Sequence, residues 1–160
     1  QILFIVKKLI LKIKKIMKIW YKDYKIEELQ PLITDTLAGA LGIKLTEITP
    51  DSLKCSMEVL QHTKQSMGIL HGGASAALCE TLGSIASNLI VDPDKFYCLG
   101  LDINASHVRP VSEGFINAEA IPVHLGKTTH IWRIDIRNEV GKLTCTSRLT
   151  MAVVAHKKTN

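Results

Sequence analysis

One segment of the chain, residues 73–90, restricts the fold more than any other. It is rich in alanine and leucine, begins at the glycine pair Gly72-Gly73 and stops before Asp92-Pro93. Such punctuation by glycine and proline is typical of a buried helix. The segment therefore predicts one long helix of roughly 27 Å, at 1.5 Å per residue.

Four β-like segments follow this helix, around residues 97–108, 115–125, 129–138 and 143–154. The turns between them are so short that we expect neighbouring strands to pair antiparallel. A long helix followed by such strands predicts an α+β fold, an antiparallel sheet wrapped around one long central helix.

Two smaller elements are expected before the long helix. Apolar residues recur at helical spacing over residues 26–38, where Pro31 suits a first turn, so a short helix is predicted there. Residues 43–48 and 53–59 flank Thr49-Pro50-Asp51-Ser52, whose proline and aspartate favour a turn, and together predict a β-hairpin.

The net positive charge of the chain comes from its first 16 residues. The net charge of +5 equals the contribution of five lysines, and the rest of the chain is neutral: Lys7, Lys8, Lys12, Lys14 and Lys15. No nucleic-acid partner is therefore expected. Residues 1–16 lack the length of a membrane span and the pattern of a signal peptide. We interpret them as an extension ahead of a start at Met17, with a basic membrane-surface helix as the alternative, and residues 17–160 as a single domain.

Cysteine and histidine spacing gives no sign of a metal or redox site. The four cysteines form no C-x-x-C pair: Cys55, Cys79, Cys98 and Cys145. The six histidines lack ligand spacing, so neither a metal nor another cofactor is expected. Without a signal peptide, we expect a reducing, cytoplasmic location and no membrane association.

The stretch with the most chemical information is residues 65–73, Gln-Ser-Met-Gly-Ile-Leu-His-Gly-Gly, which leads directly into the long helix. Glycines at a helix entrance let a ligand approach the backbone, and unpaired N–H groups there can polarise a carbonyl. That arrangement is half of an acyl-transfer site. Capping or packing by the glycines, and a capping or core role for His71, are the simpler alternatives.

Glu80 supplies the other half. It is the only acidic residue between Glu58 and Asp92, in the middle of an otherwise apolar helix. Burying a lone carboxylate costs several kcal/mol unless it has a partner or a task. Ser84 and Asn88 follow at i+4 and i+8 and extend a polar stripe along the helix. The alternative is that Glu80 faces solvent.

Several runs between residues 41 and 154 resemble the hotdog-fold thioesterases of the PaaI-like group. Within that group the chain is similar to the hydrolases of 1,4-dihydroxy-2-naphthoyl-CoA and the proofreading thioesterases of enterobactin synthesis. The matching runs are Gly68-Ile69-Leu70-His71-Gly72-Gly73, Glu80-Thr81-Leu82-Gly83-Ser84, Gly100-Leu101-Asp102-Ile103-Asn104, His107-Val108-Arg109-Pro110 and Ser147-Arg148-Leu149-Thr150.

The resemblance implies a role for each site residue. Glu80 would be the nucleophile or general base, and the Gly72 amide would polarise the thioester carbonyl. Gln65 and His71 would orient that carbonyl, and Ser84 would position the water or the carboxylate. The expected substrate and CoA contacts are Gly100, His107, Val108, Arg109 and Pro110, together with the turn formed by His124, Leu125, Gly126, Lys127, Thr128 and Thr129.

Helix geometry adds a separate expectation. Gly72 and Glu80 are eight residues apart, roughly 12 Å along a helix axis. That is too far for Glu80 to attack a carbonyl held at the entrance of its own helix, so we expect active sites shared within a homodimer. The resemblance further implies a homotetramer.

The sequence therefore predicts a thioesterase that hydrolyses an aromatic or similar acyl-CoA. Two alternatives stay open: a thioesterase acting on acyl or aryl carrier proteins, and a hotdog protein that binds acyl-CoA without hydrolysing it.

Overall fold

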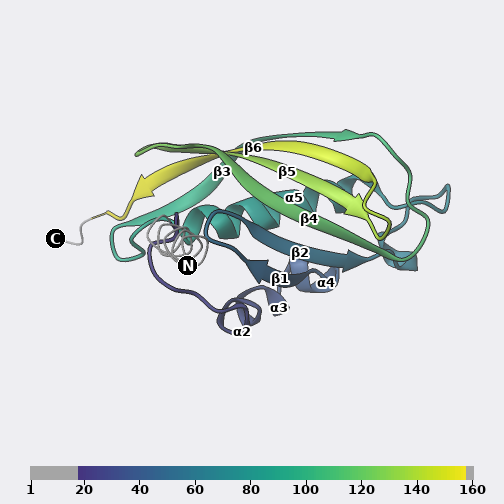
Figure 1. Cartoon of the computed structure of the whole chain (residues 1–160), viewed down its shortest axis with the longest axis horizontal. Coiled ribbons are helices and arrows are strands. Elements are labelled where there is room, and N and C mark those ends of the chain that lie inside the picture. The colour runs from purple at the N-terminus through teal and green to yellow at the C-terminus, as the bar shows by residue number, and fades with distance from the viewer. Residues whose placement is uncertain (1–17, 158–160) are drawn as a thin grey trace, which may run out of the picture.

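The computed structural model describes residues 18–157, so the predicted extension 1–16 and the start at Met17 lie outside the described residues. One long helix, α5 (Gly72–Asn88), lies against a six-stranded antiparallel sheet (Figure 1). The strands are β1 (Lys44–Ile48), β2 (Leu53–Glu58), β3 (Phe96–His107), β4 (Phe115–Leu125), β5 (Thr129–Asn138) and β6 (Leu143–Ala155). The predicted α+β class is confirmed.

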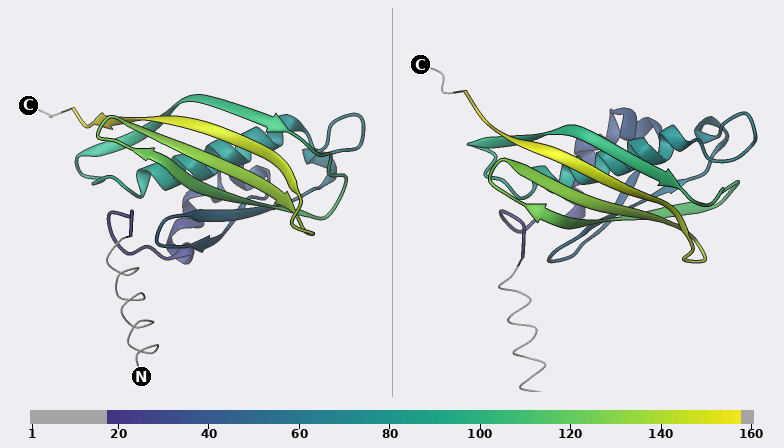
Figure 2. Two further views of the ribbon diagram at one scale, coloured as in Figure 1. Left: turned by 45° about the horizontal axis from the view of Figure 1, so that its top comes forward. Right: turned by 90° about the horizontal axis from the view of Figure 1, so that it is seen from above.

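The sheet curves over α5, which Figure 2 shows from two further directions. Leu78, Leu82 and Ala86 of the helix are fully buried. They belong to the same core cluster as Trp132 and Ile134 of β5, which are also inaccessible to solvent. Burial of side chains of this size, at about 25 cal/mol per Å² of apolar area, stabilises the packing of helix on sheet.

Strand order corrects one expectation. The order is β1-β2-β4-β5-β6-β3, so β3 pairs with β6 and not with its sequence neighbour β4. Residues 108–114 make the crossover. Seven residues can span about 23 Å, which exceeds the three strand spacings, about 14 Å, between β3 and β4. The vacant edge of β4 is taken by β2.

The first predicted helix is divided into three single turns, α2 (Ile26–Leu29), α3 (Pro31–Thr34) and α4 (Leu37–Ala40). Pro31 has no N–H to continue α2, but it suits the first position of α3. The chain leaves helical geometry at Asp35, and Thr36 caps α4 by accepting a hydrogen bond from the N–H of Ala38. A new cap between α3 and α4 prevents one continuous helix.

The predicted hairpin is present as β1 and β2, closed by a hydrogen bond from Thr49 N to Ser52 O of 2.9 Å. Within residues 18–157, no helix is both long and apolar enough to cross a membrane. The cytoplasmic location stays a prediction.

Candidate active site

The entrance of α5 is organised by His71. This residue has extended backbone geometry, and its Nδ1 accepts a hydrogen bond of 2.8 Å from Gly73 N. Its carbonyl oxygen accepts from the N–H groups of Ala74 and Ser75. Within residues 18–157, Gly72 N–H has no hydrogen-bond acceptor. The first turn of the helix therefore presents one free donor, at the position predicted to polarise a carbonyl.

The tautomer of His71 follows from the same contact. A ring nitrogen that accepts a hydrogen bond carries no proton, so Nδ1 is the unprotonated atom in this capped geometry. In the neutral ring the proton then lies on Nε2, which is free to donate. His71 thus caps the helix, as the simpler alternative held, and still has a donor available for a ligand.

A cavity of about 440 Å³ opens beside Gly72. It brings together six of the predicted site residues: Gln65, Gly72, His107, Val108, Arg109 and Pro110. Gln65 lies in a tight turn in which Gly68 has a positive φ of 77°, and Gly68 N donates to Gln65 O at 2.9 Å. The side-chain amide of Gln65 has no hydrogen bond within residues 18–157. It is available to a ligand in this cavity.

The cavity also includes residues that the sequence did not predict. Val111 O accepts from Leu70 N at 2.7 Å, which joins the residue 64–70 loop to the crossover. Thr144 O accepts from the N–H groups of Val108 and Arg109 and holds the start of the crossover against β6. Because both contacts join segments that are far apart in the sequence, no local sequence signal could have indicated them.

Glu80 lies in the middle of α5 and does not line this cavity. Its side chain is half-buried, and its carboxylate Oε1 lies directly against Gly100, where any Cβ would overlap it. Within residues 18–157, Glu80 has no hydrogen bond or ion pair. Ser84, one turn further along α5, contacts Met151 Sδ through its Oγ at 3.7 Å. Glu80, Ser84 and Gly100 therefore form a second group.

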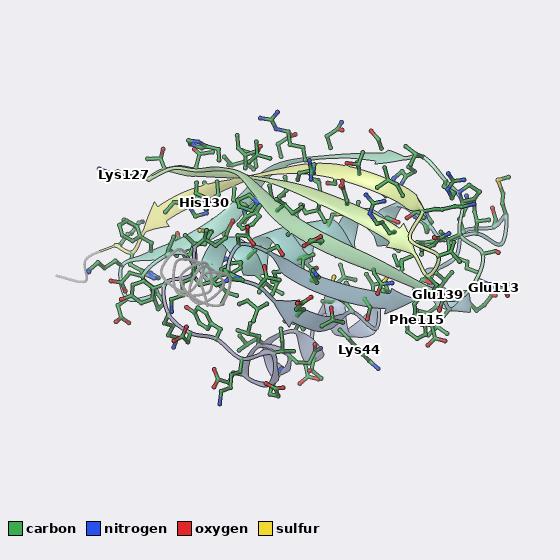
Figure 3. The ribbon with its side chains drawn as sticks, in the orientation of Figure 1. Lys44, Glu113, Phe115, Lys127, His130 and Glu139 are labelled. Carbon is green, nitrogen blue, oxygen red and sulfur yellow. The ribbon has the colours of Figure 1, made fainter. Side chains whose placement is uncertain are left out.

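The β4–β5 turn forms a third group. Gly126 N donates to Thr129 O at 2.9 Å and closes the turn, while Nε2 of His124 lies against Gly126. Lys127 is exposed at the tip. In Figure 3 it lies at the far end of the sheet from Phe115.

Within one subunit the two predicted CoA-binding groups are far apart. Arg109 N donates to Thr144 O near the start of β6, whereas Thr128 O accepts from Val153 N near its end. The nine residue-to-residue steps from Thr144 to Val153 span about 30 Å in a β-strand. Arg109 and Lys127 of one subunit are therefore too far apart to contact the same short segment of a ligand.

Behind the β4–β5 turn, His130 is 2% exposed and its Nδ1 has no hydrogen-bond partner. Burial, and then the neighbouring His124, lower its pKa from the ordinary value. The sequence did not indicate this residue, because its burial depends on the pairing of β5 with β4 and β6.

The side chains described form no metal site, and burial disfavours the thiolate forms of Cys55 and Cys98. No group of three or more His, Cys, Asp or Glu side chains within residues 18–157 is placed to hold a metal ion. All four cysteines are buried free thiols. Burial raises the pKa of Cys55 to about 12 and that of Cys98 to about 11, which disfavours the nucleophilic thiolate.

Comparison with known proteins identifies the family of this chain. Residues 67–145 match the Thioesterase superfamily. The 1,4-dihydroxy-2-naphthoyl-CoA hydrolase of Escherichia coli is 40% identical over 136 residues, which cover 85% of this chain and 99% of that protein. The chain belongs to the thioesterase superfamily.

Two further relatives of this thioesterase support the assignment. The proofreading thioesterase EntH of Cronobacter turicensis is 43% identical over 136 residues, covering 85% of this chain and 98% of that protein. The crystal structure of a mutant of thioesterase PA1618 from Pseudomonas aeruginosa matches with a TM-score of 0.85 and 42% identity, over 87% of this chain and 100% of that one. The predicted hotdog fold and thioester hydrolase activity are confirmed.

Proposed function

We propose that this thioesterase hydrolyses an aromatic or similar acyl-CoA to the free acid and CoA, with Glu80 as nucleophile or general base. The observation that carries the proposal is the free, half-buried carboxylate held against Gly100. An unpaired carboxylate in a partly desolvated position is costly to keep. A chemical task would explain why a carboxylate occupies this position.

The roles of the other site residues are inferred from the hydrogen-bond donors that have no partner within the described residues. The N–H of Gly72 would polarise the thioester carbonyl and stabilise the negative charge that develops on its oxygen. Gln65 and Nε2 of His71 would orient the same carbonyl. As a nucleophile, Glu80 would attack the carbonyl carbon and form an anhydride as the C–S bond breaks; water would then hydrolyse the anhydride, releasing the free acid and supplying the proton of the CoA thiol. As a general base, Glu80 would take a proton from the attacking water and pass it to the departing CoA sulfur as the C–S bond breaks. In both cases Ser84 would position the attacking group.

The separation between the groups supports a shared active site. Gly72 and Glu80 lie on one helix, about 12 Å apart along its axis, and Glu80 is absent from the cavity beside Gly72. Strand β3, which holds Gly100, is the last strand of the sheet and exposes Leu99 and Leu101 by 53% and 65%. An apolar edge strand of this kind favours pairing with another chain. A homodimer would bring Glu80 of one subunit to Gly72 of its partner, and the homotetramer stays a further proposal.

The CoA end of the substrate would be held by polar and basic groups. His107 and Arg109 would contact it beside the cavity, and the β4–β5 turn would supply Lys127 and backbone N–H groups for the phosphates. Since these groups are far apart in one subunit, a single CoA would meet them from different subunits.

The substrate class is supported by the relatives. The Escherichia coli relative is named for an aromatic acyl-CoA, whereas the Cronobacter turicensis relative is named for proofreading. Hydrolysis of acyl or aryl carrier proteins is therefore the second candidate. Membership of the superfamily favours either activity over binding without hydrolysis.

A hydrolysis screen separates these candidates. We expect the highest kcat/KM with aryl-CoA esters, lower values with fatty acyl-CoA and lower values with aryl-loaded carrier proteins. A preference for the carrier-bound substrate would replace the first candidate by the second. Absence of hydrolysis with all three classes would refute the proposal.

Mixed subunits test whether the site is shared. Glu80→Gln and Gln65→Ala chains, each of low activity, are denatured together and refolded. In a heterodimer with shared sites, one site carries both substitutions and the other carries none. A 1:1 mixture should then regain about a quarter of the parental activity, because half of the dimers are mixed. Activity no higher than the mean of the two variants would place both residues in one subunit's site.

A further inference from the structure

The side chain of Asn88 joins the end of helix α5 to the start of strand β3. Its Nδ2 donates to Cys98 O at 3.2 Å and to Ser84 O at 2.9 Å, and its Oδ1 accepts from Cys98 N at 2.9 Å. One amide therefore satisfies both backbone groups of Cys98. Because β3 is the last strand of the sheet, no further strand of this subunit could do so.

Two residues after Cys98, β3 changes the face that it turns toward the helix. Cys98 is buried, while further along the strand Ile103 and Ala105 are the partly buried positions. The change occurs at a β-bulge, where the register shifts between Gly100 and Asp102. A bulge adds one unpaired residue and thereby reverses the alternation of side chains. Gly100 is the last residue before this reversal and the one that lies against Oε1 of Glu80.

We propose that Asn88 is a positioning residue for the Glu80 carboxylate, acting through Cys98 and the bulge at Gly100. The proposal rests on the catalytic role proposed for Glu80. Asn88 sets the distance between β3 and α5 at Cys98. Gly100, two residues along, then forms the surface on which the carboxylate rests, and it limits the directions in which that carboxylate can point.

The hydrogen bonds between the Asn88 side chain and the backbone of Cys98, which we call the Asn88 clamp, require an amide at position 88. One end of the side chain must accept from Cys98 N while the other donates to Cys98 O. A carboxylate at position 88 would keep the acceptor but oppose two carbonyl oxygens, and an aliphatic side chain would lose both contacts. Asparagine is also short enough to hold the strand close to the helix.

The same chain offers a matched control at the other edge of the sheet. Gln30 donates to Ile43 O at 3.2 Å and accepts from Leu45 N at 2.8 Å, which clamps the start of β1 in the same way. Strand β1 is the opposite edge and holds none of the proposed site residues. Gln30→Ala therefore reports what the loss of such a clamp does to stability alone.

The test compares Asn88→Ala with Gln30→Ala in the assembled protein. We expect both to lower Tm, but only Asn88→Ala to lower kcat, by about tenfold or more for a displaced catalytic group. KM for the acyl-CoA should stay within about threefold of the parent, since uniform substrate binding is not removed. Sedimentation velocity should show that both variants keep the parental assembly. Parental kcat in Asn88→Ala, or an equal loss in Gln30→Ala, would overturn the proposal.

A second arm shows whether Asn88 acts through Glu80. In a Glu80→Gln background, Asn88→Ala should cause no further loss of kcat, because the group it positions is already inactive. The same fold-loss in both backgrounds would make Asn88 a purely structural residue and overturn the inference. If Glu80→Gln alone keeps near-parental turnover, the proposed role of Glu80 fails, and this inference fails with it.

If Asn88→Ala does not fold, Gly100→Ala tests the same contact and leaves the clamp intact. The new Cβ would overlap only the flexible end of Glu80, with Met151 Sδ as the next neighbour at 4.0 Å. We expect Tm near the parental value and a loss of kcat that disappears in the Glu80→Gln background. Parental kcat in Gly100→Ala would show that the position of the carboxylate does not depend on β3.

Discussion

The imidazole of His107 lies against Gly72, where a Cβ would come within 2.9 Å of its Nε2. His107 is the last residue of β3, and Gly72 is the first residue of α5. This contact therefore joins the edge strand to the free donor of the helix at the mouth of the cavity. Only glycine leaves room for the ring at that distance.

The first prediction tests this contact. Gly72→Ala should displace His107 and the carbonyl site, and we expect kcat/KM to fall by about tenfold to a hundredfold, as for other small misplacements of reacting groups. Tm should stay near the parental value, because the overlapping atoms belong to the end of the His107 side chain, which can move. Thermal melting and steady-state kinetics on one preparation measure both effects. Parental kcat/KM would show that this part of the cavity is not used.

The second prediction concerns the CoA end of the substrate. Arg109→Ala and Lys127→Ala should each raise KM for acyl-CoA more than they lower kcat, as expected when an interaction common to ground and transition states is lost. Lys142→Ala is the matched control, because Lys142 is an exposed lysine in the β5–β6 turn, at the other end of β5 from Lys127. An unchanged KM in both test variants would remove these residues from the site.

Much of the fold followed from local patterns. The bounds predicted for β4 and β5 agree with the observed ones, and α5 differs by one residue at its start and two at its end. The partner of β3 could not be predicted in this way. A seven-residue crossover can reach either edge of the sheet, so the choice depends on competition with β2 for the edge of β4.

The candidate site likewise has a part that local sequence motifs could predict and a part that depends on strand pairing. Gln65, Gly72 and the residues from His107 to Pro110 share a cavity, whereas Glu80 and Ser84 do not line it. The clamp made by Asn88 was not foreseen, because its partner Cys98 comes close only after β3 has taken its place beside β6. The sequence placed Asn88 on a polar stripe, but its amide is used within the fold.

The third prediction is a pH dependence of stability. Burial lowers the pKa of His130 in the folded state below its ordinary value, so the unfolded chain binds a proton more readily. Stability should therefore be full above about pH 6.5 and should decrease as the pH falls below that value toward the folded-state pKa. Thermal melting between about pH 7.5 and pH 5 measures this slope.

His130→Gln should reduce that slope, whereas His62→Gln should not, since His62 is exposed and has no hydrogen bond within residues 18–157. Equal slopes in the parent and in His130→Gln would assign the acid sensitivity to other groups.

The fourth prediction concerns Glu80 itself. Glu80→Gln keeps the size of the side chain but removes the proton acceptor, and the loss of a general base alone is typically worth about 10²–10⁴-fold in kcat. Loss of a nucleophile could cost more. Tm should hold or rise, because the variant removes a half-buried charge that has no partner within residues 18–157.

Each alternative role for Glu80 predicts a different combination of kcat and Tm for Glu80→Gln. A solvent-facing Glu80 would leave kcat and Tm near those of Glu58→Gln, a control at an exposed glutamate of β2. A purely structural Glu80 would lower Tm together with kcat. Only a catalytic Glu80 combines lost turnover with kept stability and with acyl-CoA binding that largely survives. Turnover within tenfold of the parent would refute the catalytic assignment.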